Sequence, residues 1–278
     1  MEEEKELACF CAYLQTRERS EGTIEKYRRD LKRYFRDVNA DKWLSHEGAV
    51  QWRDALVRQG YAAVSINAML AAVNGYFVFR QRLDCCARPL KRQRRAFCDP
   101  DRELDPQEYR CLLRTARKEK QNRLLMILQT MASTGIRVSE LQHITVEAVH
   151  QGHAAVHCKG KCREIFLPRA LCEKLSRWCK KQGLVSGSVF VTRSGHPIDR
   201  SNLWREMKAL CKRAGIACNK VFPHNLRHLF ARAFYRIEKN LSKLADLRGH
   251  SSIETPRIYI MESGREHQRL IDQMHLLL

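Results

Sequence analysis

Apolar residues recur every three or four positions in four stretches of the first ~85 residues, with polar residues between the stretches. This spacing puts the apolar side chains of each stretch on one face of an α-helix. Gly60 closes the third stretch, as a glycine often does at the end of a helix. We therefore predict a helical N-terminal domain whose helices include Leu7–Leu14, Ile24–Phe35, Trp52–Leu56 and Ile66–Phe77.

A second domain is predicted to begin at Leu104, where the order of residues is that of a helix start. Asp105 suits the N-cap, Pro106 suits the first helical position, and Glu108 completes a capping box. Leu104 and Tyr109 are spaced to form the hydrophobic staple of the same motif. Further along, the apolar run Leu124–Met131 predicts a buried helix that stops at Gly135, with Arg137 at the beginning of the next helix.

The period of the pattern changes to two over Ala154–Pro168, which predicts a β-hairpin with Lys159 and Lys161 at its turn. A short strand at Val189–Val191 and a helix over Leu203–Leu210 are predicted to follow. The chain as a whole is therefore predicted to be mainly α with a small β-sheet.

Residues 88–103 differ in composition from the sequence on either side and are predicted to form a linker. The first half of the linker is basic, which fits either a segment that lies along DNA or a merely solvated connector. Its second half carries the carboxylates a metal-dependent nuclease would need, but the helix start at Asp105 accounts better for the end of the linker. The predicted boundaries are 1–87 for the N-terminal domain, 88–103 for the linker and 104–278 for the second domain.

Charge restricts the class of partner. The 278 residues include 51 Lys and Arg against 31 Asp and Glu, a net charge of +20, which favours a polyanion bound in a salt-dependent way. No run of ~18 apolar residues exists to form a spanning helix, and the acidic start Met-Glu-Glu-Glu-Lys-Glu is unlike a signal peptide. We therefore expect a cytoplasmic protein without a membrane partner.

The twelve cysteines include no Cys-x-x-Cys pair of the zinc-ribbon kind. We expect reduced thiols that act as small core residues, and no bound metal.

The second predicted helix carries six cations against three acidic residues. Helix charges usually form a solvated face, but this excess favours contact with phosphate groups. The cations predicted to contact DNA, including those of the linker and the hairpin, are Lys26, Arg29, Lys32, Arg33, Arg36, Lys91, Arg92, Arg94, Arg95 and Lys161.

His224, Arg227 and His228 are spaced at i, i+3 and i+4, so a helix places them on one face. That face has cationic and proton-carrying groups but no carboxylate, which suits an oxyanion such as a phosphodiester. Zinc binding by the two histidines is disfavoured, because Asn225 stands where a metalloprotease helix has glutamate. The opposite, apolar face is predicted to consist of Leu226, Phe230, Ala233 and Ile237.

Several motifs occur in a fixed order: Thr-Gly-Ile-Arg-Val-Ser-Glu-Leu at 134–141, His-Asn-Leu-Arg-His at 224–228, Leu-Arg-Gly-His at 247–250, and Tyr259 nine residues after the last His. With the Lys-containing hairpin between the first two, they resemble the tyrosine recombinase family, which includes phage integrases and Xer proteins. Thr-x-x-x-Tyr-x-x-Asp-Leu at 23–31 resembles the core-binding domain of that family. The resemblance implies a helical, SAM-like core-binding domain followed by an α+β catalytic domain.

The resemblance also implies a reaction without cofactor or metal. Tyr259 attacks phosphorus and forms a 3′-phosphotyrosyl bond, while Lys159, or alternatively Lys161, protonates the departing 5′ oxygen. The two motif arginines hold the non-bridging oxygens. The implied catalytic residues are Tyr259 as nucleophile, Arg137, Lys159, His224, Arg227 and His250.

The partners that the resemblance implies are double-stranded DNA recombination sites and further copies of the chain, as a dimer on each site and a tetramer in synapsis. Residues 265–278 form an amphipathic stretch, which family members pass to a neighbouring protomer. Folding back onto its own domain is the alternative. Work on DNA implies association with the nucleoid.

Two positions depart from the family pattern. Arg248 precedes Gly-His where a small or apolar residue is common, and Pro256 stands where Thr is usual. Ser251 and Glu254 form a capping box for a helix that Pro256 would interrupt at a cost of about 3 kcal/mol, so we expect the Tyr259 helix to begin at Pro256. Pro256 favours one alternative function, a DNA-binding or architectural protein with impaired cleavage. A second alternative is a type IB topoisomerase.

Overall fold

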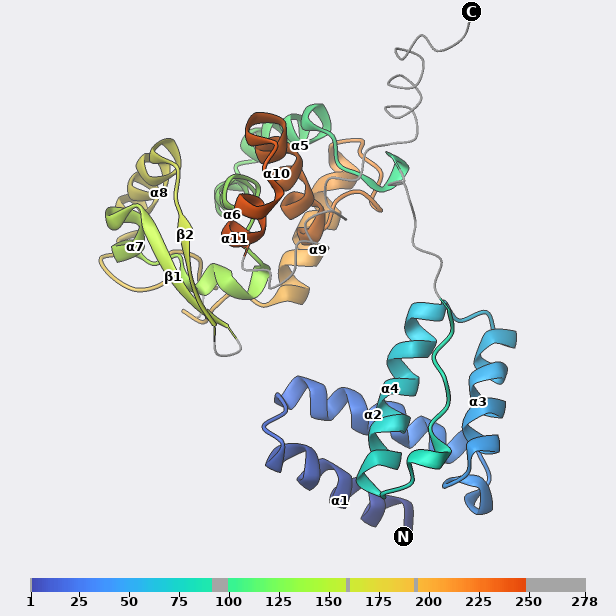
Figure 1. The fold of residues 1–278 in the computed structure, drawn as a ribbon. Helices are drawn as coiled ribbons and strands as arrows, with labels where there is room; N and C mark the ends of the chain where they lie inside the picture. The colour runs from blue at the N-terminus through green and yellow to red at the C-terminus, as the bar shows by residue number, and fades with distance from the viewer. Residues whose placement is uncertain (1, 92–99, 159–160, 193–194, 249–278) are drawn as a thin grey trace, which may run out of the picture. The chain divides into compact units, whose positions relative to one another are not determined.

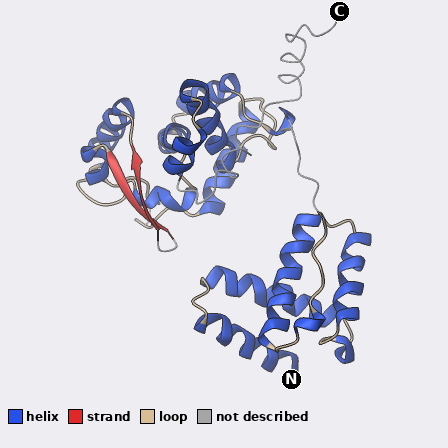
Figure 2. Cartoon of the chain, viewed as in Figure 1, coloured by secondary structure: helices blue, strands red, loops and turns tan. Residues whose placement is uncertain are grey.

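Helices make up most of the structure, a computed structural model that describes residues 2–91, 100–158, 161–192 and 195–248 (Figure 2). Within these residues the strands form one two-stranded sheet. The predicted fold class, mainly α with a small sheet, is therefore confirmed. The chain divides into two compact units, residues 1–94 and 95–278, referred to below as the first and second units.

The first unit contains the four predicted helices (Figure 1). Its centre is α4, which is apolar on nearly every side and contacts the other three helices, as expected for a helix buried all round. The amphipathic α2 turns Leu31, Tyr34 and Phe35 inward and its cations outward. The elements are α1 (Glu2–Thr16), α2 (Glu21–Asp37), η1 (Ala40–Lys42), α3 (His46–Arg58), α4 (Ala63–Phe79) and η2 (Leu83–Cys85).

The capping box predicted at Asp105 is present at the start of α5. Asp105 Oδ1 accepts from the backbone N–H groups of Gln107 (2.6 Å) and Glu108 (2.8 Å), and Glu108 Oε2 accepts from the N–H of Asp105 (3.0 Å). The second unit contains η3 (Pro100–Arg102), α5 (Pro106–Lys118), α6 (Asn122–Thr134), η4 (Val138–His143), α7 (Val146–Gln151), β1 (His153–Cys158), β2 (Lys161–Phe166), α8 (Arg169–Gln182), α9 (Arg200–Arg213), α10 (Pro223–Glu238) and α11 (Leu241–Arg248).

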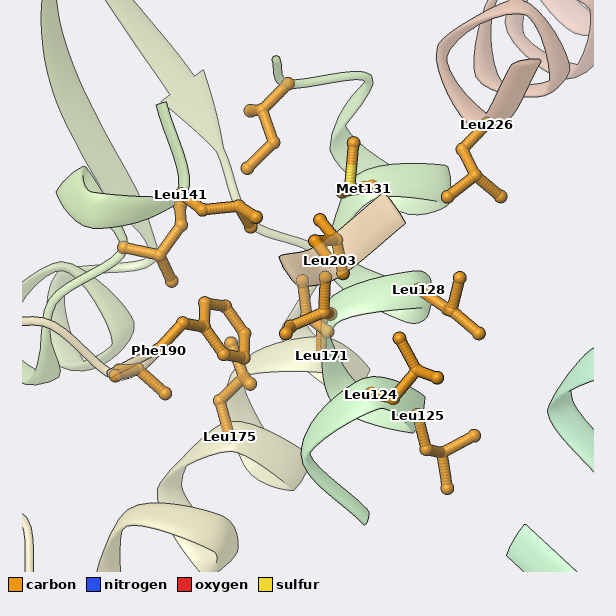
Figure 3. Packing of buried hydrophobic residues seen from close by; sticks show 14 of the residues in the cluster. Leu124, Leu125, Leu128, Met131, Leu141, Leu171, Leu175, Phe190, Leu203 and Leu226 are labelled. Atoms are coloured by element: carbon orange, nitrogen blue, oxygen red, sulfur yellow. The ribbon is translucent and has the colours of Figure 1, made fainter. Parts of the chain in front are cut away.

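The core of the second unit is built around α6, the helix predicted to be buried. Its apolar side chains pack into one cluster with residues of α8, α9 and α10 and with the loop that contains Phe190 (Figure 3). This cluster fixes α10 against α6 and so determines where the functional side chains of α10 lie. Labelled members are Leu124, Leu125, Leu128, Met131, Leu141, Leu171, Leu175, Phe190, Leu203 and Leu226.

The predicted hairpin is confirmed as the antiparallel pair β1–β2. Directly opposite residues of an antiparallel pair project from the same face of the sheet. Ala154 pairs with Ile165 and Val156 pairs with Arg163, and the three apolar members are buried. The register therefore puts Arg163 on the core-facing side of the hairpin.

The strand predicted at Val189–Val191 was wrong. These residues form no named strand, although Val191 makes an isolated bridge with Pro197 and Val189 and Phe190 are buried. Proline has no backbone N–H, so a ladder cannot be extended through Pro197. The apolar run reflects burial in a loop.

The apolar face predicted for α10 was partly wrong. Leu226 is buried and Phe230 is half-buried, but Ala233 and Ile237 are exposed, Ile237 to 87%. The apolar side is continued instead by Ala231 and Phe234, which pack with Leu244 of α11. The contact with α11 therefore decides which side of α10 is covered in its last turns.

Helix α6 ends in contact with α10. Gly135 has a φ of +64°, the left-handed conformation that favours glycine. A Cβ at this position would lie 2.4 Å from Cδ1 of Phe230, so the Phe230 ring of α10 would have to move to admit a larger residue. Gly135 thus satisfies both a backbone and a packing requirement.

Among the described helices, none is both long and apolar enough to cross a membrane. The nine cysteines whose side chains are described are free thiols.

Gly135→Ala is expected to destabilise the chain by about 1–2 kcal/mol for the left-handed backbone and by roughly a further 1–3 kcal/mol for the forced movement of Phe230. Gly183→Ala is the matched control, because Gly183 ends α8 with a φ of +67° and a Cβ there would meet nothing within 4 Å. Urea denaturation of the full chain measures both. Equal losses from the two substitutions would show that the Phe230 contact adds nothing.

Candidate active site

Arg227 links α10 to the turn after α6. Its side chain is 2% exposed, and Nη1 donates to the backbone carbonyl oxygen of Gly135, 92 residues earlier in the sequence. A guanidinium keeps its charge in proteins, so its burial requires hydrogen-bond acceptors. Gly135 lies two residues before Arg137, the N-cap of η4. Both motif arginines are therefore brought to the same turn between α6 and η4.

Arg137 is held by Glu140 in two ways. Its backbone N–H donates to Glu140 Oε2 (2.7 Å), and its Nη1 donates to Glu140 Oε1 (2.8 Å). The Arg137 side chain is 40% exposed, whereas that of Glu140 is 3% exposed. The arrangement orients an accessible guanidinium with a carboxylate that solvent does not reach.

Arg163 is the second cation on Glu140. Its Nη2 lies 2.5 Å from Glu140 Oε2, and its Nη1 donates to the backbone carbonyl of Leu247 at 2.9 Å. Arg163 thus connects strand β2 to η4 and to the last turn of α11. Helix ends carry carbonyls without helical partners, and a guanidinium is a suitable donor to them.

The pKa of Glu140 is set by opposing effects. Burial raises it, but the N–H of Arg137 and the charges of Arg163 and Arg137 lower it more, so the pKa lies below its ordinary value of 4.5. Glu140 is therefore ionised at neutral pH. With two guanidinium groups around one carboxylate, the trio has a net charge of +1, which suits an anionic ligand.

The two histidines of α10 lie side by side. The rings of His224 and His228 are 4.8 Å apart between centroids and inclined at 70°, with His224 exposed and His228 half-buried. Asn225 fastens the first turn of the helix, since its Nδ2 donates to the carbonyls of Arg102 (2.5 Å) and Lys220 (2.8 Å). The face predicted for His224, Arg227 and His228 is therefore divided: the arginine points into the core, and the exposed His224 is accessible.

Three of the six predicted catalytic residues are described: Arg137 is the N-cap of η4, and His224 and Arg227 lie on α10, where Arg227 bonds the turn after α6. Lys159, His250 and Tyr259 lie outside the described residues, as do Pro256 and the stretch 265–278. Lys161 is the first residue of β2, and its side chain is not described. No group of three or more His, Cys, Asp or Glu arranged to hold a metal occurs among the residues that the structure describes.

Sequence reasoning missed Glu140 and Arg163. The signal for Glu140 was its place three residues after Arg137, a spacing at which helical side chains meet. The signal for Arg163 was its spacing along the strand. It stands two and four residues before the buried Ile165 and Leu167, and such residues share one face of a strand, so its side chain points inward. An arginine on a buried strand face requires an acidic partner, and the sequence did not indicate which one.

The predicted DNA-contacting cations of α2 differ in how firmly they are held. Lys26 pairs with Asp30 (2.7 Å) and donates to the carbonyl of Ala68 on α4. Arg33 pairs with Asp37 (3.2 Å), donates to Tyr61 Oη and Gln59 Oε1, and stacks over the Tyr61 ring. These two side chains therefore also hold the first unit together.

Arg29, Lys32 and Arg36 are more accessible. Arg29 pairs with Asp30 and Arg36 pairs with Asp37, and each arginine side chain remains 73% exposed. Lys32 is also exposed. The two guanidinium groups are largely in solvent although Asp30 is buried, and ion pairs of this kind are weak, so both arginines can turn toward phosphate groups. The five predicted cations of α2 line a hollow of about 740 Å³ between α2 and α4, together with the carboxylates of Glu3 and Asp30 and residues that include Tyr61, Ser65 and Met69. Of the linker cations, Lys91 is exposed, whereas Arg92, Arg94 and Arg95 lie outside the described residues.

Comparison with known proteins identifies relatives over nearly the whole chain. A sequence model described as the phage integrase family matches residues 102–265, and one described as the phage integrase N-terminal SAM-like domain matches residues 7–82. Tyrosine recombinase XerA of Pyrococcus furiosus is 27% identical over 276 residues, which cover 96% of this chain and 93% of XerA.

Two solved structures have the same fold at low identity. A lambda integrase dimer bound to a COC′ core site has a TM-score of 0.75 at 18% identity, covering 94% of this chain and 96% of that chain. A lambda integrase tetramer bound to a Holliday junction has a TM-score of 0.75 at 17% identity, covering 94% and 78% respectively.

Glu140→Gln is expected to lower stability at neutral pH by about 3 kcal/mol, because two guanidinium groups lose their buried partner. A carboxyl whose pKa is lowered on folding stabilises the protein above its unfolded pKa, and this contribution is lost as the pH falls through the folded pKa. The stability difference between wild type and variant should therefore shrink as the pH falls from about 6 to below the ordinary pKa of 4.5.

Glu164→Gln, on the exposed side of β2, is the control for this titration and should change stability little at any pH. Urea denaturation across the pH range measures both variants. A wild-type advantage over Glu140→Gln that is constant with pH would contradict the ion-pair interpretation.

Proposed function

Because this chain belongs to the phage integrase family of tyrosine recombinases, we propose that it cleaves and rejoins DNA at specific sites through a 3′-phosphotyrosyl intermediate formed by Tyr259. The observation that carries the proposal is the bond from Arg227 to the carbonyl of Gly135, two residues before Arg137. The accessible guanidinium of Arg137 can hold a non-bridging oxygen of a phosphodiester, where negative charge increases during the reaction, and the buried Arg227 adds positive charge at the same turn.

In the proposed reaction, the Tyr259 hydroxyl oxygen forms a bond to phosphorus as the bond from phosphorus to the 5′ oxygen breaks. A phenol of pKa about 10 is mostly protonated at neutral pH, and a cationic site favours its ionised form. Lys159, with Lys161 as the alternative, gives a proton to the 5′ oxygen, while His224 and His250 donate hydrogen bonds to the phosphoryl group. One phosphoester replaces another, so rejoining needs no ATP.

The charge on the phosphoryl group is balanced by arginine, so we expect no divalent cation to be required. XerA and lambda integrase carry the words recombinase and integrase in their names, and the lambda structures contain DNA-bound dimers and tetramers. On that basis we infer a dimer on each DNA site and a tetramer in synapsis. Residues 265–278, the stretch that family members pass to a neighbouring protomer, would join the copies, and folding back onto its own domain is the alternative. DNA as substrate also implies a protein of the cytoplasm, associated with the nucleoid.

A DNA-binding protein without strand cleavage is the second candidate, and Pro256 is the feature that favours it. Both candidates predict DNA binding. Only the recombinase forms a covalent adduct, so the nucleophile provides the decisive test.

Tyr259→Phe is expected to abolish covalent adduct and leave the Kd for DNA unchanged, because the attacking oxygen is lost while the cations remain. The probe is a duplex selected by the wild-type protein from a randomised pool and nicked at successive positions near its centre. Adduct is measured as protein that stays on labelled DNA in SDS, with EDTA present. Adduct from the variant would exclude Tyr259 as nucleophile, and site-selective binding without wild-type adduct would favour the second candidate.

The triple variant Arg29→Gln, Lys32→Gln and Arg36→Gln is expected to weaken DNA binding and to reduce the salt slope by about one for each phosphate that is no longer neutralised, roughly three in total. Arg80→Gln is the control for the loss of a single positive charge elsewhere in the first unit, because Arg80 lies beyond the far end of α4, about 16 Å along the axis from Met69, and pairs with Glu6. Titration of the same duplex at several salt concentrations gives both slopes. Equal slopes for the triple variant and wild type would show that these cations are only a solvated face.

A further inference from the structure

Among the hairpin side chains that the structure describes, Arg163 bonds directly to the candidate active site. Its side chain is only 12% exposed, and its two Nη atoms reach different elements. One donates to Glu140 on η4 at 2.5 Å, and the other donates to the carbonyl of Leu247 on α11 at 2.9 Å. A planar guanidinium fork fixes the direction of both bonds at once, which a lysine cannot do.

Glu140 transmits this constraint to Arg137. Each of its oxygens accepts from Arg137, and Oε2 accepts from Arg163 as well. Because the carboxylate is 3% exposed, water does not compete for these bonds. The rotamer of Glu140 is therefore determined from both sides, and with it the direction of the half-exposed Arg137 guanidinium.

We propose that Arg163 is a positioning residue for Arg137, acting through the buried carboxylate of Glu140. The proposal rests on the proposed function, in which Arg137 holds the phosphoryl group. Arg163 does not touch DNA in this arrangement. It holds β2, η4 and the end of α11 in fixed positions relative to one another, so that the Arg137 guanidinium is already oriented before DNA binds.

Arg163→Met retains much of the side-chain volume and removes both hydrogen bonds. We expect it to slow adduct formation by about 10²-fold, the loss that follows a ~1 Å displacement of a reacting group, with the Kd for the selected duplex unchanged. Arg163→Lys can satisfy one partner at a time and should recover part of the lost rate. The lysine variant also covers the case in which Arg163→Met does not fold.

Arg123 is the matched control in the same unit. It also bonds one carboxylate and one carbonyl, with Nη2 2.5 Å from Glu206 Oε1 and Nη1 3.3 Å from the carbonyl of Val191. The Arg123 and Glu206 side chains are 33% and 36% exposed, so Arg123→Met should cost less stability than Arg163→Met, although it removes the same kinds of hydrogen bond. It should leave the rate of adduct formation at the wild-type value.

A second readout does not depend on cleavage. In protein labelled with ¹⁵N-arginine, the Nε–Hε signal of Arg137 is assigned by its loss in Arg137→Lys. We expect this signal to shift or broaden in Arg163→Met and to stay unchanged in Arg123→Met.

An unchanged Arg137 signal in Arg163→Met, or a wild-type rate of adduct formation, would overturn the positioning role. Equal slowing by Arg123→Met and Arg163→Met would do the same, since the effect would then be general destabilisation. Absence of adduct with wild-type protein, together with a shifted Arg137 signal, would refute the proposed function and leave the positioning role supported.

Discussion

The hydrogen bond from the buried Arg227 guanidinium to the carbonyl of Gly135 is the interaction on which the second unit depends. A permanent charge inside a protein is tolerated only with acceptors around it, so α10 must lie where the end of α6 offers one. Gly135 allows this contact between α6 and α10 in two ways: it adopts the left-handed backbone that ends α6, and it leaves space for the Phe230 ring. The apolar cluster around α6 holds both helices in place while this bond forms.

Charge is distributed unequally around that junction. Glu140 is the buried anion between Arg137 and Arg163, and its pKa is lowered because hydrogen bonds and cations outweigh the effect of burial. The carboxylate orients the arginines without being available to an anionic ligand. An exposed carboxylate in the same place would repel a phosphodiester, so its burial is as important to the site as its charge.

Local sequence by itself determined most of the secondary structure and indicated three of the described candidate site residues. Helical spacing predicted α1–α4 and α6, the capping box predicted the start of α5, and alternation predicted the hairpin, because each signal depends on neighbours within a few residues. Arg137, His224 and Arg227 were indicated by short motifs that can be read directly in the sequence, at 134–141 and 224–228. Alternation along the strand also indicated that Arg163 points inward, but the sequence did not indicate its partner.

Only the tertiary structure decided which residues meet. Glu140 and Arg163 are 23 residues apart, and Arg227 and Gly135 are 92 apart, so no local pattern connects them. The exposure of Ile237 was decided by packing against α11, and the loop at Val189–Val191 ends at a bridge to Pro197; both partners lie only a few residues further along the chain, but the contacts are made between separate elements. Periodicity reports that a side chain is buried or exposed; the neighbour it is buried against is set by packing between elements, and here that packing converts two separate arginine motifs into one site.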